Sequence, residues 1–267
     1  MRRSIVRPLG LALALAGLLA ASATAAELPD FSGLWSLRGG TLFDRATADP
    51  PDAVSGMPFH RERPPYNAQW EAKYEANIKR AADGLFPDPN STCGTPTGFP
   101  RIFSLPDTYE FVVRPEEFWV VAENGPNVLR VYTDGRAHPP ADEMWPTYSG
   151  DSVGRWEGDT LVFDTVSVRG EPYQIVDRTG AVFSSQLRGV TRIHKLSPDL
   201  IEVKMTLTDA AAFTKPWVVT KTFERLKQKD VRAYDYACAE NNRNPITADG
   251  YTLTLGTDGK PIDKPRP

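Results

Sequence analysis

The chain has 267 residues, with 31 Lys and Arg residues against 34 Asp and Glu residues and a formal net charge of −3. A chain of this length can bury a sizeable core and can enclose a pocket. Its mildly acidic, scattered charge argues against nucleic acid as a partner, because that partner calls for a basic patch or stripe.

The first 26 residues have the organisation of a secretory signal peptide. Three arginines form a basic region, residues 9–21 form an apolar run, and small residues around Ala25 supply a cleavage site. The apolar run is shorter than the roughly 20 residues that a membrane-spanning helix needs. We therefore expect cleavage after Ala25 or Ala26 and a periplasmic or secreted protein without membrane insertion. Its net charge is then −6, because 28 basic residues face the 34 acidic ones.

One helix is expected, at residues 66–83. Its aromatic side chains recur every four residues at Tyr66, Trp70 and Tyr74, which is the spacing of one helix face. We expect this aromatic stripe to pack on the body of the protein rather than to line a ligand site.

Most of the remaining chain is expected to be β-structure. Residues 27–37 predict a short first strand, while residues 41–65 and 85–100, where Pro and Gly are frequent, predict long loops. From residue 101 to residue 226, short runs of β-branched and aromatic residues alternate with turn signals. The expected strands are 101–105, 108–114, 117–123, 127–133, 152–157, 160–167, 187–196, 200–208 and 217–226.

This pattern predicts a mainly β fold with antiparallel connections, because no helices separate the strands. Two closures fit: an up-and-down barrel of lipocalin type, and a sandwich. The triplet Gly33-Leu34-Trp35 is similar to the Gly-x-Trp that opens many lipocalin barrels, and this resemblance favours the barrel. We expect residues 27–243 to form a single barrel domain with one N-terminal helix and long N-terminal loops. Residues 244–267 are expected to be a loosely held tail.

Cys93 and Cys238 are the only two cysteines in the sequence. In an oxidising compartment, an even pair without metal-ligand spacing predicts one disulfide. The alternative is two separate buried thiols.

Two neighbouring motifs are the most distinctive part of the sequence. Residues 132–139 follow the pattern Tyr-Thr-Asp-Gly-Arg-x-His-Pro, and residues 150–162 follow Gly-x-Ser-x-Gly-x-Trp-Glu-Gly-Asp-Thr-Leu-Val. These motifs resemble a broad group of secreted, largely uncharacterised bacterial proteins, over most of residues 93–243. The resemblance implies secretion and no particular activity. Where many members of the group carry a His after the second Cys, this chain has Ala239.

The second motif contains Gly-Asp-Ser-Val-Gly, which has the form of a nucleophile elbow. An elbow requires a strand, a sharp turn and a following helix. Here the sequence predicts a second strand after a hairpin turn at Glu157-Gly158-Asp159, so we do not expect Ser152 to be a nucleophile.

Cofactor chemistry is not indicated. The three histidines, His60, His138 and His194, do not have metal-ligand spacing, and no Gly-rich phosphate loop follows a strand. We therefore expect neither a metal nor an organic cofactor, which leaves acid–base chemistry by side chains alone.

The candidate catalytic residues are Asp134, Arg136, His138 and Tyr148. The first three alternate along one segment, so in an extended conformation they project to the same side. A carboxylate beside an imidazole orients it, and a nearby Arg can stabilise an oxyanion. The alternative is a turn in which Asp134 caps its own backbone and His138 is an ordinary surface residue.

The candidate binding residues are aromatic or charged. Arg155 and Glu157 share one face of their strand, and Trp156 lies on the other. If the pair points inward, the barrel encloses a buried ion pair, whose desolvation cost suggests a functional role. If the pair points outward, Trp156 belongs to the core. The full set is Arg101, Trp145, Arg155, Trp156, Glu157 and Arg188.

Three functions are consistent with these features. The first is a cofactor-free acid–base enzyme, a lyase, dehydratase or isomerase, acting on a small apolar or aromatic compound in the barrel. The second is a non-catalytic carrier that uses the same cavity, and the third is an interaction module of the cell envelope. Convergence of the candidate catalytic residues in a pocket would favour the enzyme. A barrel whose interior is filled by side chains would favour the interaction module. The substrate and the oligomeric state stay open.

Overall fold

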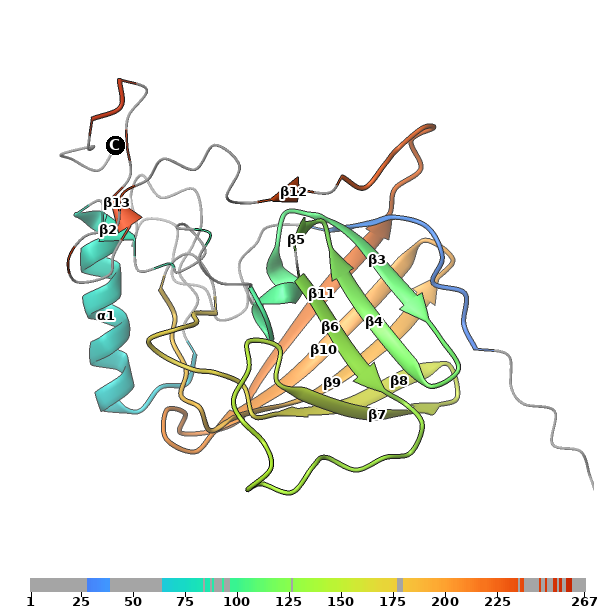
Figure 1. Cartoon of the computed structure of the whole chain (residues 1–267), viewed down its shortest axis with the longest axis horizontal. Coiled ribbons are helices and arrows are strands. Elements are labelled where there is room, and N and C mark those ends of the chain that lie inside the picture. Colours follow the sequence, from blue (N-terminus) through green and yellow to red (C-terminus); the bar gives the residue numbers. More distant parts are fainter. Residues whose placement is uncertain are drawn as a thin grey trace, which may run out of the picture.

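A computed structural model gives the fold of the chain (Figure 1). The described residues are 28–38, 64–83, 85–86, 88, 93, 97–125, 127–176, 180–234, 236–237, 245, 248, 252–253, 255 and 258–260. The expected signal peptide and most of the loop at residues 41–65 lie outside this set, as does most of the expected tail. No helix among the described residues is long and apolar enough to cross a membrane.

Nine strands close into a barrel in the order β1-β11-β10-β9-β8-β7-β6-β4-β3. Their bounds are β1 Trp35–Leu37, β3 Thr108–Val113, β4 Glu117–Ala122, β6 Asn127–Tyr132, β7 Asp151–Glu157, β8 Thr160–Val166, β9 Leu187–Ser197, β10 Leu200–Asp209 and β11 Trp217–Arg225. Two short pairs form separate two-stranded sheets: β2 (Leu85–Phe86) with β13 (Thr252–Leu253), and β5 (Asn124–Gly125), which lies between β4 and β6, with β12 (Tyr236–Ala237). The predicted mainly β barrel with a single helix is confirmed.

The interior of the barrel is occupied by the protein's own side chains. Along β10, Ile201, Val203, Met205 and Leu207 are completely buried, as their alternation with polar residues predicts. Aromatic rings contact one another across the interior; those of Tyr109 and Phe223, for example, lie 4.8 Å apart. Burial of these apolar surfaces is the main source of stability for such a fold.

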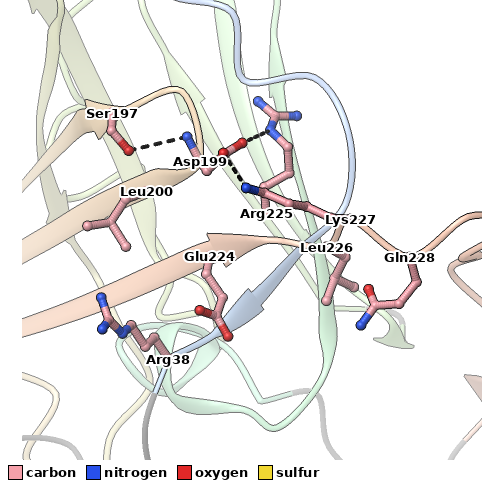
Figure 2. Close-up of a pocket in the computed structure, with 9 residues that line it drawn as sticks. All are labelled: Arg38, Ser197, Asp199, Leu200, Glu224, Arg225, Leu226, Lys227 and Gln228. Carbon is pink, nitrogen blue, oxygen red and sulfur yellow. Dashed lines mark hydrogen bonds and ion pairs between the residues drawn. The ribbon is translucent and has the colours of Figure 1, made fainter.

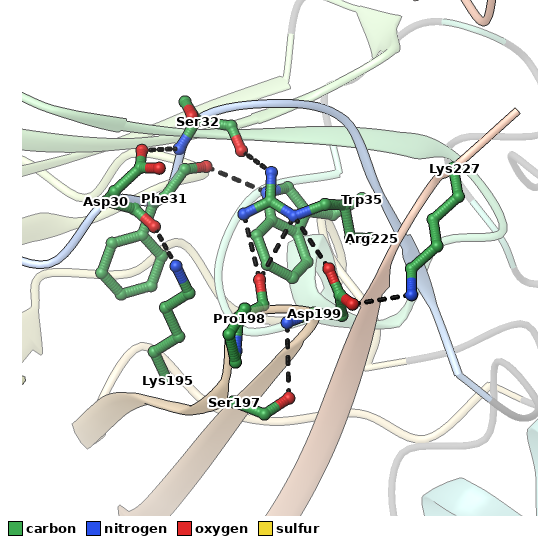
Figure 3. Close-up of polar contacts among 10 residues, drawn as sticks. All are labelled: Asp30, Phe31, Ser32, Trp35, Lys195, Ser197, Pro198, Asp199, Arg225 and Lys227. Carbon is green, nitrogen blue, oxygen red and sulfur yellow. Dashed lines mark hydrogen bonds and ion pairs between the residues drawn. The ribbon is translucent and has the colours of Figure 1, made fainter. Parts of the chain in front are cut away.

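One end of the barrel, the turn end, carries the β7–β8 and β9–β10 hairpin turns, and the N-terminal segment closes it (Figure 3). The Arg225 guanidinium lies 4.3 Å from the centre of the buried Trp35 ring and donates to the carbonyl oxygens of Ser32 and Pro198. Gly33 has a φ of +93°, and a Cβ there would lie 2.5 Å from an Arg225 nitrogen. The Gly-x-Trp triplet is thus held beneath the last barrel strand.

Helix α1 (Ala68–Ala82) lies at the opposite end, which we name the helix end (Figure 1). The Asn67 side chain caps the helix by accepting a hydrogen bond from the Trp70 backbone. Trp70 and Tyr74 are buried, which confirms that the aromatic stripe packs on the body of the protein.

The strand expected at residues 101–105 is wrong, because Arg101–Ser104 form a short 3-10 helix, η4. The segment enters the barrel: the Phe99 ring lies against Gly189, and the Phe103 ring lies 6.5 Å from that of Phe223. A short apolar run predicts a buried strand and a buried plug equally well, and here the plug forms.

The neighbours β6 and β7 are parallel, whereas the other barrel strands pair antiparallel. A parallel pair needs a crossover connection that returns the chain to the starting end. Residues 133–150 form this crossover loop, which lies outside the barrel below β7 in Figure 1. It contains most of the first distinctive motif and leads directly into the second.

Candidate functional site

The two distinctive motifs meet around His138. The imidazole Nδ1 of His138 lies 2.5 Å from Asp151 Oδ1 at the start of β7, and its Nε2 lies 3.4 Å from Asp164 Oδ2 on β8. Arg188 on β9 binds Asp164 through two nitrogens, and this contact raises the pKa of the guanidinium. We name these four residues the clasp, because they fasten the crossover loop to three strands.

The geometry of the clasp limits what His138 can do chemically. A carboxylate only accepts hydrogen bonds, so Nδ1 donates to Asp151. Nε2 is buried and has no hydrogen-bond partner among the described residues, with Asp164 in front of it. A general base must reach the proton that it abstracts, and Asp164 occupies that position. The clasp therefore favours a fixed loop rather than an open acid–base centre.

The other candidate catalytic residues do not contact His138 in this arrangement. Asp134 and Arg136 bind each other, and the Arg136 backbone donates to Asp134 at 3.2 Å, as in the turn that we gave as the alternative. The hydrogen bonds from Arg136 lower the pKa of Asp134. The Arg136 guanidinium lies over the Tyr132 ring, 4.0 Å from its centre. Tyr148 belongs to a different cluster.

That cluster is formed by Tyr148, Arg169 and Tyr173 at the helix end. Trp145 lies three positions before Tyr148 on the crossover loop, and we name these four residues together the aromatic surface. The Arg169 guanidinium lies 5.3 Å from the Tyr148 ring centre and 5.1 Å from that of Tyr173. Trp145 is 75% exposed and Tyr173 is 53% exposed. Trp145 and Tyr148 were candidates from the sequence, whereas Arg169 and Tyr173 were not, because no local motif links them to the first two.

The backbone beneath this surface is firmly held. Thr147 bridges to Val168, with hydrogen bonds to the carbonyl oxygen of Ser167 and from the backbone of Arg169. The buried Gln174 side chain donates to the carbonyl oxygens of Tyr148, Thr97 and Phe99. The aromatic surface is therefore pre-organised on the barrel.

Two of the three candidate binding residues on β7, Arg155 and Glu157, point outward. Arg155 binds Glu157, and Arg192 on β9 binds the same carboxylate; the hydrogen bond from Arg192 is the largest cause of its lowered pKa. Trp156 lies on the opposite face, with its ring 6.1 Å from that of Phe118 in the core. Arg188 is likewise outside the barrel, in the clasp.

Arg101 is a candidate whose side chain is buried. It forms a bidentate ion pair with Asp88 at 2.7 and 2.8 Å, and both side chains are buried. Lys221 on β11 is a second buried cation, which the sequence analysis missed although its strand alternation places it with the inward residues. Buried charges are costly, so these groups need their partners.

A groove of about 670 Å³ opens at the turn end, lined by the end of β11 and the residues after it, by the β9–β10 turn, and by Arg38 just after β1 (Figure 2). Asp199 in the β9–β10 turn binds Lys227 at 2.6 Å and Arg225 at 3.3 Å. The hydrogen bond from Lys227 and the neighbouring positive charges lower the pKa of Asp199. The lining residues are Arg38, Ser197, Asp199, Leu200, Glu224, Arg225, Leu226, Lys227 and Gln228.

Ser152 is buried on β7 and exchanges a 2.8 Å hydrogen bond with the Thr165 hydroxyl. The segment after it is a strand, a turn and a second strand, which confirms that it is not an elbow. Among the described residues, no group of three or more His, Cys, Asp or Glu side chains has the geometry to hold a metal ion. Cys93 is described and Cys238 lies outside the described residues, so their pairing stays a prediction.

No protein-family model matches this chain, and no curated protein matches it.

Proposed function

We propose that this protein is a non-catalytic binding module of the bacterial cell envelope that recognises saccharide through its aromatic surface. One contrast carries the proposal: the protein's own side chains occupy the barrel interior, whereas Trp145 and Tyr173 are exposed on the outside. Large exposed aromatic side chains mark interaction sites on soluble proteins. Export to the periplasm, inferred from the first 26 residues, is part of the same proposal.

The chemistry of the surface suits a sugar. A pyranose ring presents a flat face of C–H groups, which stacks on Trp and Tyr rings, and a rim of hydroxyls. The rings of Tyr148 and Tyr173 lie against Arg169, so the edge of the guanidinium is the part that offers donors to hydroxyls. Asp142 and Glu143, exposed on the same loop, supply acceptors. The firmly held backbone reduces the entropy that binding must overcome.

The same geometry supports the other two hypotheses less. A carrier needs free volume inside the barrel, where tightly packed aromatic rings lie instead. An acid–base enzyme that uses His138 needs an open nitrogen, and Asp164 covers Nε2.

Co-sedimentation of the purified protein with purified peptidoglycan sacculi tests the proposal. We expect the protein to pellet with the sacculi, and Trp145→Ala and Tyr173→Ala to reduce the bound fraction at least about fivefold. Tyr234→Ala is the matched control, because Tyr234 is 69% exposed and lies outside the aromatic surface. A protein that stays in the supernatant, or variants that pellet as well as the control, would contradict the proposal.

A further inference from the structure

The groove at the turn end lies far from the aromatic surface. It adjoins the β9–β10 turn, whereas the aromatic surface adjoins Thr147 and Val168, beyond the opposite ends of β7 and β8. A ligand in the groove would therefore be separate from the saccharide proposed above.

The positive charges of the groove divide into a neutralised set and an available set. Arg225 is held by Trp35, by two carbonyl oxygens and by Asp199, and Lys227 shares that carboxylate (Figure 3). Arg38 is different, because its guanidinium is exposed and forms no ion pair with any residue that the structure describes. Glu224 is also exposed and forms no ion pair within the same part of the chain.

The surroundings of the groove are positive overall. Its lining carries three cations, Arg38, Arg225 and Lys227, against two carboxylates. The exposed segment that follows adds Lys229 and Arg232 against Asp230 alone. The groove lining and this segment together therefore carry five positive against three negative side chains, and this excess favours an anion.

We propose that the groove binds a small organic oxyanion, a carboxylate or phosphate carried on a short apolar group. The planar fork of Arg38 matches such an anion bidentately, and Arg38 lines the groove with its guanidinium unpaired among the described residues (Figure 2). Leu200 and Leu226 line the same groove and provide contacts for the apolar group. Glu224 opposes the anion, so its carboxylate weakens binding.

Chemical-shift perturbation with ¹⁵N-labelled protein and sodium octanoate tests this proposal. We expect saturable shifts confined to the amides of β1, the β9–β10 turn and residues 224–228. Arg38→Ala should raise the Kd about tenfold, which corresponds to about 1.4 kcal/mol, and Glu224→Gln should lower it. Arg155→Ala is the matched control, because Arg155 is an exposed arginine on a different part of the barrel. Arg38 is exposed, so its replacement should leave the fold and melting temperature unchanged.

Two further experiments test whether the charge or the apolar group of the ligand drives binding, and whether the ligand is free or part of a lipid. Inorganic phosphate should shift the same amides more weakly than octanoate, and 1-octanol should shift none of them. Vesicles of phosphatidylglycerol test whether a lipid headgroup presents the oxyanion. If the protein binds the vesicles and Arg38→Ala abolishes that binding, the natural ligand is a lipid headgroup. If the protein binds octanoate but not the vesicles, the natural ligand is a free oxyanion. Absence of binding in both arms overturns the proposal. So does an Arg38→Ala protein that binds octanoate as the wild type does, or tighter binding of octylamine.

Discussion

At the level of single residues, one side chain, Arg225, explains why the Gly-x-Trp triplet has Gly at its first position and Trp at its third. The guanidinium covers the Trp35 ring and passes so close to Gly33 that a Cβ there would collide with it. Gly33 is thus favoured by its φ of +93°, and a Cβ there would force the Arg225 guanidinium to shift. The sequence resemblance identified the triplet, but its partner, nearly 200 positions away, could not be found without the barrel closure.

We expect Gly33→Ala to destabilise the protein more than Gly135→Ala. Gly135 has a similar φ of +85°, but an added Cβ would meet nothing within 4 Å. Both variants incur the left-handed backbone cost of about 1–2 kcal/mol, and only the first displaces Arg225. Urea titrations give the loss in the free energy of unfolding for each variant. The difference between the two losses is the cost of displacing Arg225. Equal values for the two variants would contradict this account.

The partners of His138 in the structure differ from the expected ones, and the difference has a physical reason. The alternation of Asp134, Arg136 and His138 suggests one shared face only if the chain is extended, and Gly135 bends it into a turn instead. The true partners, Asp151 and Asp164, lie on later strands. Asp151 was visible within the second motif, but joining it to His138 requires knowing that residues 133–150 cross back along the barrel.

At the level of elements, strand boundaries followed closely from alternation and turn signals. Residues 200–208 illustrate this, because one apolar face packs inside while charged and polar residues face solvent. The strand prediction for residues 101–105 was wrong because the whole segment is buried. Its sequence therefore has no alternation that would distinguish a strand from the 3-10 helix. The parallel β6–β7 pair was not foreseen either, since the crossover loop contains no helix and resembles an ordinary long connection.

The clasp predicts how firmly this crossover loop is attached. His138→Ala leaves the Asp151 and Asp164 carboxylates without the ring between them, and we expect a loss of about 1–3 kcal/mol in the free energy of unfolding. Hydrogen–deuterium exchange should become faster at residues 137–150 and stay unchanged in β10. His194→Ala is the matched control, because His194 forms an exposed contact with Asp159 at 3.2 Å, worth at most about 1 kcal/mol. Unchanged exchange in the loop would show that the clasp does not fasten it.

At the level of the whole molecule, the barrel is a scaffold with different chemistry at its two ends. The helix end carries exposed aromatic rings around Arg169, and the turn end carries a positive groove at Arg38. Composition and periodicity predict the scaffold, because they depend on burial, which repeats along each strand. They do not predict the two surfaces, because each is assembled from segments that only the barrel closure brings together.

The Cys93–Cys238 bridge is the remaining prediction at this scale, and it tests the compartment together with the covalent structure. The chain has no other cysteine, so oxidation during export leaves one possible intramolecular pairing. The bridge would close a very long loop, for which the loop-entropy account gives about 4–5 kcal/mol, and Cys93→Ser should therefore lower the melting temperature. Non-reducing peptide mapping of periplasmic protein should recover the Cys93 and Cys238 peptides joined. The intact mass should match a chain whose first residue is Ala26 or Glu27. Two titratable thiols per native chain would refute the bridge, and a retained Met1 would refute the export on which it depends.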